Sequence, residues 1–432
     1  MEDETRVFLP KTKQTSDFFA HEGPELRKFR SYLRWVYVDQ SNFCRTALSW
    51  TVFFVVAFVI PLLSHFLLLC SDCDSDHTRP YHIPVQISLS VLATLSFLCL
   101  SKWDRKYGMR KFLFLDKILT ESDKTQRGYA QQLQRTMKLI MLWGLPCFLA
   151  ECAYKIWWFA SGGSELPYYG NRYSSAIVLG ALELFSWIYR TSIFFLVCVF
   201  FRLICYLEIL KLEEFAQVFH HETEVVSILV EHLNHRRNLR IISHRFRFFI
   251  LASLLLVTAS QLIFLVITTK TGADVDILRA GELALVAITL VSGLYILLRS
   301  ATKITHKAQA ITGLAAKWHA CATINSFDNE GETPRVTEEA ASTQVIPVNA
   351  LLGSSDEDEV GDEEDELDNT KMLPIYTHTI SFHKRQALVT YMENNRAGIT
   401  VYGFMLDRTW LHSIFGVQLA LCLWLLNKTI GI

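Results

Sequence analysis

The sequence predicts an all-α polytopic membrane protein with seven transmembrane helices. Three observations predict this class. Hydrophobic residues make up 51% of the 432-residue chain, and the mean hydropathy is +0.23, which is more apolar than an ordinary soluble enzyme. The apolar residues fall in runs of about 20, long enough to cross a bilayer as helices. The connections between these runs alternate between basic-rich and basic-poor, as the positive-inside rule requires.

Seven runs of high hydropathy are the candidate spans. Backbone groups in hydrocarbon need internal hydrogen-bond partners, so each run is expected to be a helix. Pro61 and Pro146 lie inside the first and third runs, where they predict kinks whose freed carbonyls must be satisfied by neighbouring helices. The seven runs are Ala47–Cys70, Pro84–Trp103, Met137–Phe159, Ser175–Phe200, Phe248–Thr269, Leu283–Leu298 and Thr409–Leu426.

The distribution of basic residues predicts the orientation of the chain. Lys and Arg are concentrated before the first span and after the second, fourth and sixth spans. The other connections contain only Arg79, Arg172, Lys270 and Arg279. The positive-inside rule therefore places the N-terminus in the cytosol and, after seven spans, the C-terminus on the extracellular or lumenal side.

The pattern between the spans divides the chain into segments. Helical apolar spacing continues beyond the fourth and sixth spans, and these amphipathic extensions must bury one face, so we expect a cytosolic helical bundle. The acidic linker that follows contains Ser354 and Ser355; it is a solvated disordered segment or a site of regulation by phosphorylation. The segments are a cytosolic N-terminal part (1–45), membrane helices one to six (46–300) with extensions at about 201–245 and 300–325, the acidic linker (326–375), a cytosolic first half of the seventh helix (376–408) and its membrane half (409–427).

Ionisable residues inside two spans are candidates for a ligand pocket, because such residues are costly in a membrane. Glu151, Lys155 and Trp158 share one face of the third span, and Glu183, Trp187 and Arg190 repeat that spacing in the fourth. Tyrosines can supply aromatic walls, suited to a small amphipathic or aromatic ligand. The alternative is that the charges neutralise one another as packing and the aromatic residues form the interfacial belt. The tyrosines are Tyr154, Tyr168, Tyr169, Tyr173 and Tyr295.

The end of the chain resembles a known family. The segment RAGITVYGFMLDRTWLHSIFG, followed by LALCLWLLNKTIGI, resembles the plant gustatory-receptor-like proteins, long a domain of unknown function. That family is distantly similar to the insect odorant and gustatory receptors. The resemblance covers nearly the whole chain, and Arg396–Trp410 is its most specific part. The insect Thr-Tyr…Gln-Phe signature near the end of the last helix is not present in this sequence.

The resemblance implies an insect-chemoreceptor-like fold and a homotetrameric, ligand-gated cation channel. It implies a ligand pocket for an unknown small molecule in the outer half of each bundle, and a second half of the seventh helix that lines a central axis. The cytosolic extensions and the first half of that helix would form the assembly anchor. The anchor residues implied are Tyr391, Gly403, Phe404, Asp407, Arg408 and Trp410.

Two stripes along the last span are candidates for lining such an axis. One contains Ile414, Val417, Leu421 and Trp424, and the other contains Phe415, Gln418, Cys422 and Leu425. A conducting path favours the stripe that carries Gln418, with apolar neighbours that gate by dewetting. The alternative is that Gln418 bonds between subunits and that the axis conducts nothing.

Other classes of function have little support in the sequence. It contains no phosphate-binding loop, nucleophile elbow or HExxH motif, so we expect no enzyme, no catalytic residue and no cofactor. Cys70 and Cys73 form a lone Cys-x-x-Cys. This pair favours a local disulfide or free thiols over a metal site, which needs a full set of ligands. With 42 Lys and Arg against 43 Asp and Glu, no basic surface for nucleic acid is expected. The hypotheses are a chemoreceptor-like channel in the plasma membrane or an endomembrane and, as an alternative, a non-conducting membrane scaffold with the same fold.

Overall fold

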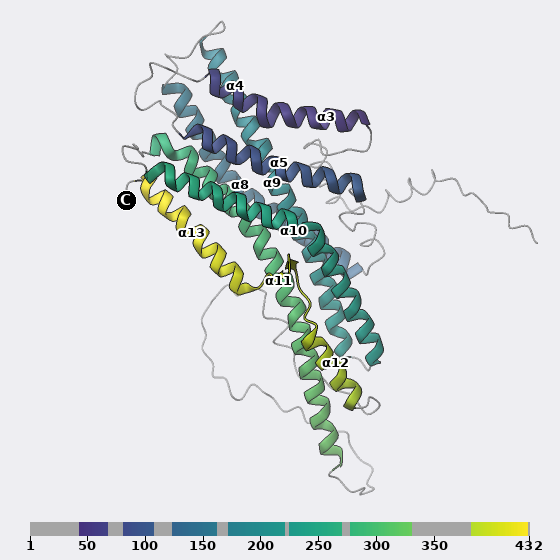
Figure 1. The fold of residues 1–432 in the computed structure, drawn as a ribbon. Helices are drawn as coiled ribbons and strands as arrows, with labels where there is room; N and C mark the ends of the chain where they lie inside the picture. The colour runs from purple at the N-terminus through teal and green to yellow at the C-terminus, as the bar shows by residue number, and fades with distance from the viewer. Residues whose placement is uncertain are drawn as a thin grey trace, which may run out of the picture. The chain divides into compact units, whose positions relative to one another are not determined.

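The computed structural model describes residues 43–67, 81–107, 123–161, 172–220, 224–269, 277–330 and 382–430 (Figure 1). Within these ranges the predicted helical class is confirmed, with one two-stranded hairpin as the exception. The helices are α3 (Phe43–Phe54), the π-helix η1 (Val55–Val59), α4 (Ile60–Leu67), α5 (His82–Tyr107), α8 (Asp123–Ser161), α9 (Arg172–Ala216), the 3-10 helix η3 (Gln217–His220), α10 (Val225–Thr269), α11 (Ile277–Glu330), α12 (Phe382–Asn394) and α13 (Arg408–Ile430); the strands are β1 (Thr400–Val401) and β2 (Phe404–Met405).

Six stretches of the described residues are helical, long and apolar enough to cross a membrane. Each overlaps one predicted span, and together they indicate an integral membrane protein. The predicted third span lies in α8, a continuous helix that passes through Pro146 but is not among the six. The count of seven and the orientation of the termini therefore stay predictions. The six stretches are Cys44–Phe66, His82–Lys106, Ile177–Phe219, Val225–Thr269, Gly281–Thr323 and Arg408–Lys428.

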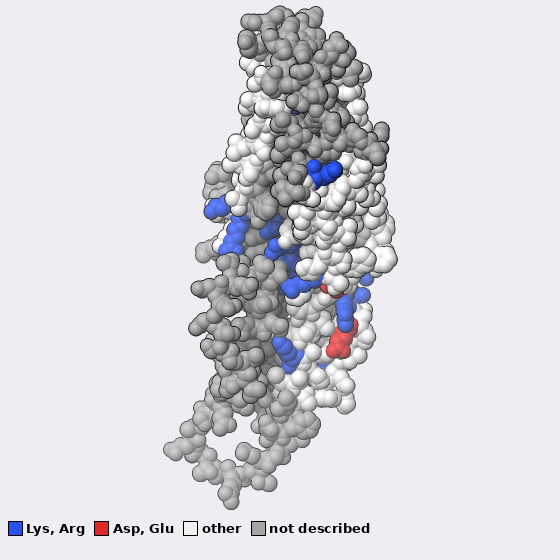
Figure 2. Space-filling model, turned by 90° about the vertical axis from the view of Figure 1, so that its left-hand side faces the viewer, with Lys and Arg blue, Asp and Glu red and all other residues white. Residues whose placement is uncertain are grey.

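The surface of the described residues agrees with a membrane environment. Large apolar side chains such as Phe54, Ile177 and Val266 are exposed along these helices. On the face drawn in Figure 2, Lys and Arg form several separate groups, while a large share of the described surface carries no charge. Exposed apolar area on this scale needs a covering, which a bilayer supplies.

The chain divides into two compact units. The first contains all seven predicted spans, and it also contains the hairpin. The second is built from the segments that the sequence predicts to be the cytosolic extensions, together with α12; its position relative to a membrane stays a prediction. The units are Met1–Leu210, Arg240–Ile304 and Ile399–Ile432 for the first, and Lys211–Leu239 and Thr305–Gly398 for the second.

The kink predicted at Pro61 takes the form of the π-helix η1, one turn before the proline. Proline has no amide hydrogen and its ring clashes with the carbonyl four residues earlier, so the carbonyls of Val56 and Ala57 lose their donors. The Ser186 hydroxyl on α9 donates to the Val56 carbonyl (2.7 Å). The Ser90 hydroxyl on α5 donates to the Ala57 carbonyl (2.8 Å). Neighbouring helices therefore satisfy the freed carbonyls, as predicted.

The first half of the seventh helix is shorter than predicted. The prediction extended it from 376 to 408; residues 376–381 lie outside the described part, and α12 ends at Asn394. The chain then forms the hairpin, in which Thr400 pairs with Met405 and Val401 with Phe404. Gly398 weakens a helix, and the β-branched residues of Ile399–Val401 favour a strand. The two-residue turn has positive φ at Tyr402 (48°) and Gly403 (95°), the geometry of a tight hairpin turn that favours glycine.

Candidate functional site

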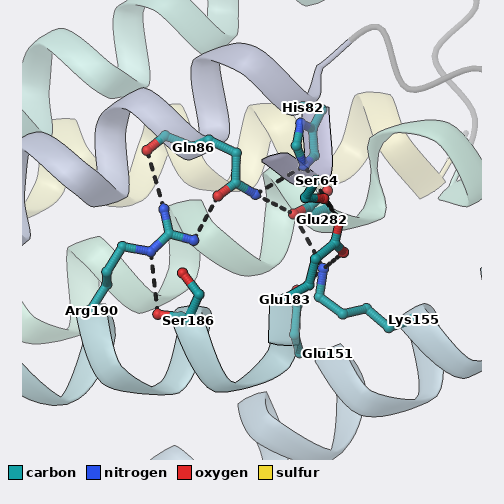
Figure 3. A network of polar contacts seen from close by, with 9 residues as sticks. All are labelled: Ser64, His82, Gln86, Glu151, Lys155, Glu183, Ser186, Arg190 and Glu282. Atoms are coloured by element: carbon teal, nitrogen blue, oxygen red, sulfur yellow. Dashed lines mark hydrogen bonds and ion pairs between the residues drawn. The ribbon is translucent and has the colours of Figure 1, made fainter. Parts of the chain in front are cut away.

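A cluster of charged and polar side chains lies inside the first unit (Figure 3). Five helices contribute to it, and every member except Gln86 is buried. We call this set the charged cluster. It consists of Ser64 on α4, His82 and Gln86 on α5, Glu151 and Lys155 on α8, Glu183, Ser186 and Arg190 on α9, and Glu282 on α11.

The centre of the charged cluster is the Lys155 ammonium, which is 4% exposed. Its Nζ lies 2.8 Å from Oε2 of Glu183, 3.4 Å from Oε1 of Glu151 and 3.7 Å from Oε1 of Glu282. Glu151 and Lys155 meet because residues four apart share a helix face. The contact with α9 and α11 is tertiary, so one ammonium links three helices.

Glu183 connects the ammonium to two further helices. Its Oε2 accepts the hydrogen bond from Lys155, while its Oε1 accepts one from the Ser64 hydroxyl on α4. His82 Nε2 on α5 lies 4.0 Å from the same Oε1, and the His82 ring stacks on the ring of His65 at 6.0 Å between centroids. Glu183 is thus the carboxylate with the most complete set of partners.

Arg190 belongs to the same network but does not pair with Glu183. Its Nη2 donates to Oε1 of Gln86 (2.6 Å), and its Nη1 donates to the Gln86 carbonyl (3.3 Å) and to Oγ of Ser90 (3.1 Å). Gln86 in turn donates from Nε2 to Oε1 of Glu282 (3.2 Å). The Gln86 amide therefore connects the guanidinium with a carboxylate of the Lys155 group.

Glu151 is the carboxylate with the weakest support. Its side chain is 0% exposed and, within the described part of the chain, neither oxygen accepts a hydrogen bond, so the ion pair with Lys155 is its stabilising contact. The charged cluster has three carboxylates (Glu151, Glu183 and Glu282) and two cations (Lys155 and Arg190), so its formal charge is −1 with a neutral His82. Buried charge that is not fully compensated is costly. Protonation of one carboxylate, or a ligand that pairs with one, would therefore change which groups of the charged cluster are paired.

The predicted aromatic residues are only partly brought to the charged cluster. Trp158 and Trp187 are buried on α8 and α9. Tyr154 lies against Gly281, where an added Cβ would be 3.4 Å from its ring, next to Glu282. Tyr295 is elsewhere, because its ring packs on Phe415 of α13 (4.6 Å) and its hydroxyl accepts a hydrogen bond from Arg299 (2.9 Å). Tyr168 and Tyr169 lie outside the described residues, as does the side chain of Tyr173.

The stripe of α13 predicted to line an axis packs within the subunit, and its place at an axis between copies stays a prediction. Gln418 is 2% exposed and donates from Nε2 to Oγ1 of Thr258 on α10 (2.6 Å). Phe415 packs on Tyr295, while Cys422 and Leu425 are buried. A polar amide in an apolar helix gains a partner by facing its own bundle. In the other stripe Val417 (58%) and Trp424 (36%) are exposed, while Ile414 and Leu421 are half-buried.

The predicted anchor residues are divided between the two units. Tyr391 is in the second unit, where Arg236 donates from Nη1 to its hydroxyl (3.3 Å) and to Oδ1 of Asn395 (2.9 Å). Tyr391 also lines a shallow groove of about 540 Å³ along α12. Gly403, Phe404, Asp407, Arg408 and Trp410 are in the first unit, in the hairpin and the start of α13, where Oδ1 of Asp407 accepts a hydrogen bond from the Arg408 amide (3.0 Å).

Sequence reasoning missed several members of the charged cluster. Glu282 immediately precedes the predicted sixth span, and His82 precedes the second, so both resemble solvated helix ends. Gln86 and Ser64 are uncharged residues within spans, and serine is common in membrane helices. Their role becomes visible only when α4, α5 and α11 are packed together. Cys70, Cys73 and the acidic linker from residue 331 onward lie outside the described residues.

The chain was compared with known proteins. The family model described as "Protein of unknown function (DUF3537)" matches residues 24–417. No curated protein matches. Among solved structures, the insect olfactory receptor OR5 from Machilis hrabei is similar over 93% of this chain and 98% of its own, at 13% identity and a TM-score of 0.49.

Proposed function

The chain belongs to the protein family of unknown function DUF3537, and we propose that it is a chemoreceptor-like membrane protein whose charged cluster responds to a small ligand. The observation that carries the proposal is the position of the Lys155 ammonium, within 4 Å of carboxylates from three helices. Ionisable residues inside apolar helices are expensive and mark functional sites.

The charged cluster is suited to convert binding into helix movement. Lys155 has three carboxylates within reach, so a ligand that pairs with one of them changes which helix the ammonium holds. A ligand shifts an equilibrium only through contacts that differ between two states. Exchange of the Lys155–Glu183 pair for a ligand contact is such a difference, because this pair links α8 to α9. The ligand class proposed is a small amphipathic or aromatic molecule, in keeping with the buried Trp158 and Trp187.

The finer proposal is a homotetramer that conducts cations. It is supported by the resemblance carried by Arg396–Trp410. It is also supported by the surface of α13, because only 17% of the most apolar stretch of this helix is buried within the subunit. Four copies of such a helix can meet around an axis. The stripe proposed for that axis is Ile414, Val417, Leu421 and Trp424, in which Val417 and Trp424 are exposed.

One observation favours the alternative, a non-conducting membrane scaffold. The stripe proposed for the axis offers no polar side chain in its central part. The polar side chain of the other stripe, Gln418, donates its hydrogen bond to Thr258 within the subunit. A narrow apolar path excludes water and closes by dewetting. A helix with this surface associates with other membrane helices whether or not ions pass.

Binding is tested by ligand-induced thermal stabilisation of the purified protein against a panel of small amphipathic and aromatic compounds. At least one compound is expected to raise the unfolding temperature, because a ligand that binds only the folded state stabilises it. The Glu183→Gln and Trp187→Ala variants are expected to lose this rise, each measured from its own unliganded baseline. The control is Glu213→Gln, since Glu213 is on the second unit and paired with Lys307. An unchanged rise in both test variants would contradict the proposed site.

A further inference from the structure

We propose that the β1–β2 hairpin is a membrane-contact site, with the aromatic side chains of Tyr402, Phe404 and Trp410 in the interfacial layer of the bilayer. These side chains are among the exposed aromatics of the first unit, at 51%, 68% and 50%. The rings of Phe404 and Trp410 are 6.4 Å apart, so they form one patch. The proposal is independent of the charged cluster, and it assigns Phe404 and Trp410 to lipid in place of the assembly contacts that the resemblance implies for them.

The hairpin is fixed to the helix that follows it. Asp407 caps α13: its side-chain Oδ1 accepts from the Arg408 amide (3.0 Å) and its carbonyl accepts from the Leu411 amide (3.2 Å). The candidate span begins at Arg408, only three residues after β2 ends at Met405. Phe404 is therefore close to the level at which α13 enters the apolar layer.

The hairpin is also fixed to α10. The Thr400 amide donates to Oγ of Ser243 (3.1 Å), and the Arg247 guanidinium lies over the ring of Tyr402, 5.1 Å from its centroid. The predicted fifth span begins at Phe248, which is itself 59% exposed. Two spans thus reach their charged ends, Arg247 and Arg408, at the same hairpin.

The pattern of side chains agrees with one face against protein and one against lipid. Ile399, Val401 and Leu406 are buried, and the Leu406 amide donates to the Ile399 carbonyl (3.0 Å) to hold the base of the hairpin. The large exposed side chains of this segment are aromatic. Tyrosine and tryptophan concentrate at membrane interfaces, because their rings are apolar and their polar atoms stay hydrated. Arginine at the same level keeps its charge in the headgroups while its stem lies along the apolar boundary.

The test is site-specific photocrosslinking in phosphatidylcholine vesicles, using the full chain with Phe404→p-benzoylphenylalanine. Irradiation is expected to give a lipid adduct, identified by mass. Phe185→p-benzoylphenylalanine, at an exposed site midway along a span, is the positive control. Phe382→p-benzoylphenylalanine is the negative control. Position 382 is on α12 and is predicted to lie outside the membrane, so no lipid adduct is expected there.

Trp410→p-benzoylphenylalanine gives a second reporter, so that the test does not depend on one variant folding. Lipid adducts at 404 or 410 as abundant as at 185 would support the proposal. A product between two copies of the chain in place of the lipid adduct would overturn it, because the patch would then be covered by protein. Absence of both products at folded 404 and 410 variants would also overturn it, since the patch would then face water.

Discussion

The Nζ of Lys155 on α8 lies 2.8 Å from Oε2 of Glu183 on α9, with both side chains at most 5% exposed. A buried ion pair of this kind is not by itself strong evidence for stability, because both charges lose their hydration. Its importance is that the Lys155 ammonium is shared: without it, Glu183, Glu151 and Glu282 lose their common cation, whereas without Glu183 the ammonium keeps the two longer contacts. The pair therefore links the position of two helices to a single electrostatic contact.

Removal of Lys155 alone is expected to be more harmful than removal of Lys155 and Glu183 together. Lys155→Met should lower the free energy of unfolding by about 3–5 kcal/mol, the cost of leaving buried carboxylates without their cation, and Glu183→Gln by about 1–3 kcal/mol, because Lys155 keeps Glu151 and Glu282 but loses its shortest hydrogen bond. The double variant should recover part of the loss caused by Lys155→Met, because two charges are removed together. Thermal unfolding in detergent measures all three. Independent, additive losses would show that the contact is not energetically coupled.

The two glutamates beside Lys155 are expected to differ. Glu151→Gln should change the free energy of unfolding by less than about 1 kcal/mol, within the usual range for near-neutral substitutions. The reason is that Glu151 accepts no hydrogen bond among the described residues, and that its removal lowers the excess negative charge. Glu183→Gln is the matched control with the same change of atoms. Equal destabilisation by the two variants would contradict the assignment of Glu151 as the excess carboxylate.

The serines near Pro61 are expected to matter only while the proline is present. Ser186→Ala should cost about 1–3 kcal/mol, since the buried Val56 carbonyl loses its donor. In the Pro61→Ala background the same substitution should cost less, because a regular α-helix can form and the Ile60 amide, which donates to Val55 in the π-turn, can then donate to Val56. A double-mutant cycle by thermal unfolding measures this coupling. A cycle with no coupling energy would mean that the hydroxyl does not compensate for the proline.

The close approach of α9 and α11 depends on Gly293. A Cβ at this position would lie 2.2 Å from Cε1 of Phe194, a ring that is fully buried. Gly293→Ala is therefore expected to lower the free energy of unfolding by about 1–3 kcal/mol, as overpacking does. Gly144→Ala on α8 is the control, because nothing lies within 4 Å of its added Cβ. Similar effects of both substitutions would indicate that helix propensity, and not packing, decides the outcome.

Much of the helical architecture could be predicted from the sequence. Hydropathy located the spans that the structure contains as helices, and the chemistry of proline predicted that carbonyls near Pro61 would need donors from other helices. Helical spacing placed Glu151 and Lys155 on one face. These features depend on local sequence and on the absence of water in hydrocarbon.

The rest depended on tertiary packing. The spacing of Phe415 and Gln418 defines a stripe, but it does not say what that stripe contacts within the subunit, such as the hydroxyl of Thr258. Arg190 was expected near Glu183, yet Gln86 on another helix receives its guanidinium. The hairpin had a local signal in the Tyr402–Gly403 turn between β-branched and aromatic residues, which the continuous helix predicted to residue 408 overlooked.

Cation flux through proteoliposomes tests the central claim most directly. Purified full-length protein would be reconstituted and exposed to the same panel of small amphipathic and aromatic compounds, with and without an applied voltage. The proposal predicts that at least one compound triggers flux, that Glu183→Gln abolishes the response, and that Glu213→Gln retains it. Folded protein that passes no cations with any compound at any voltage would contradict the channel and leave the non-conducting scaffold.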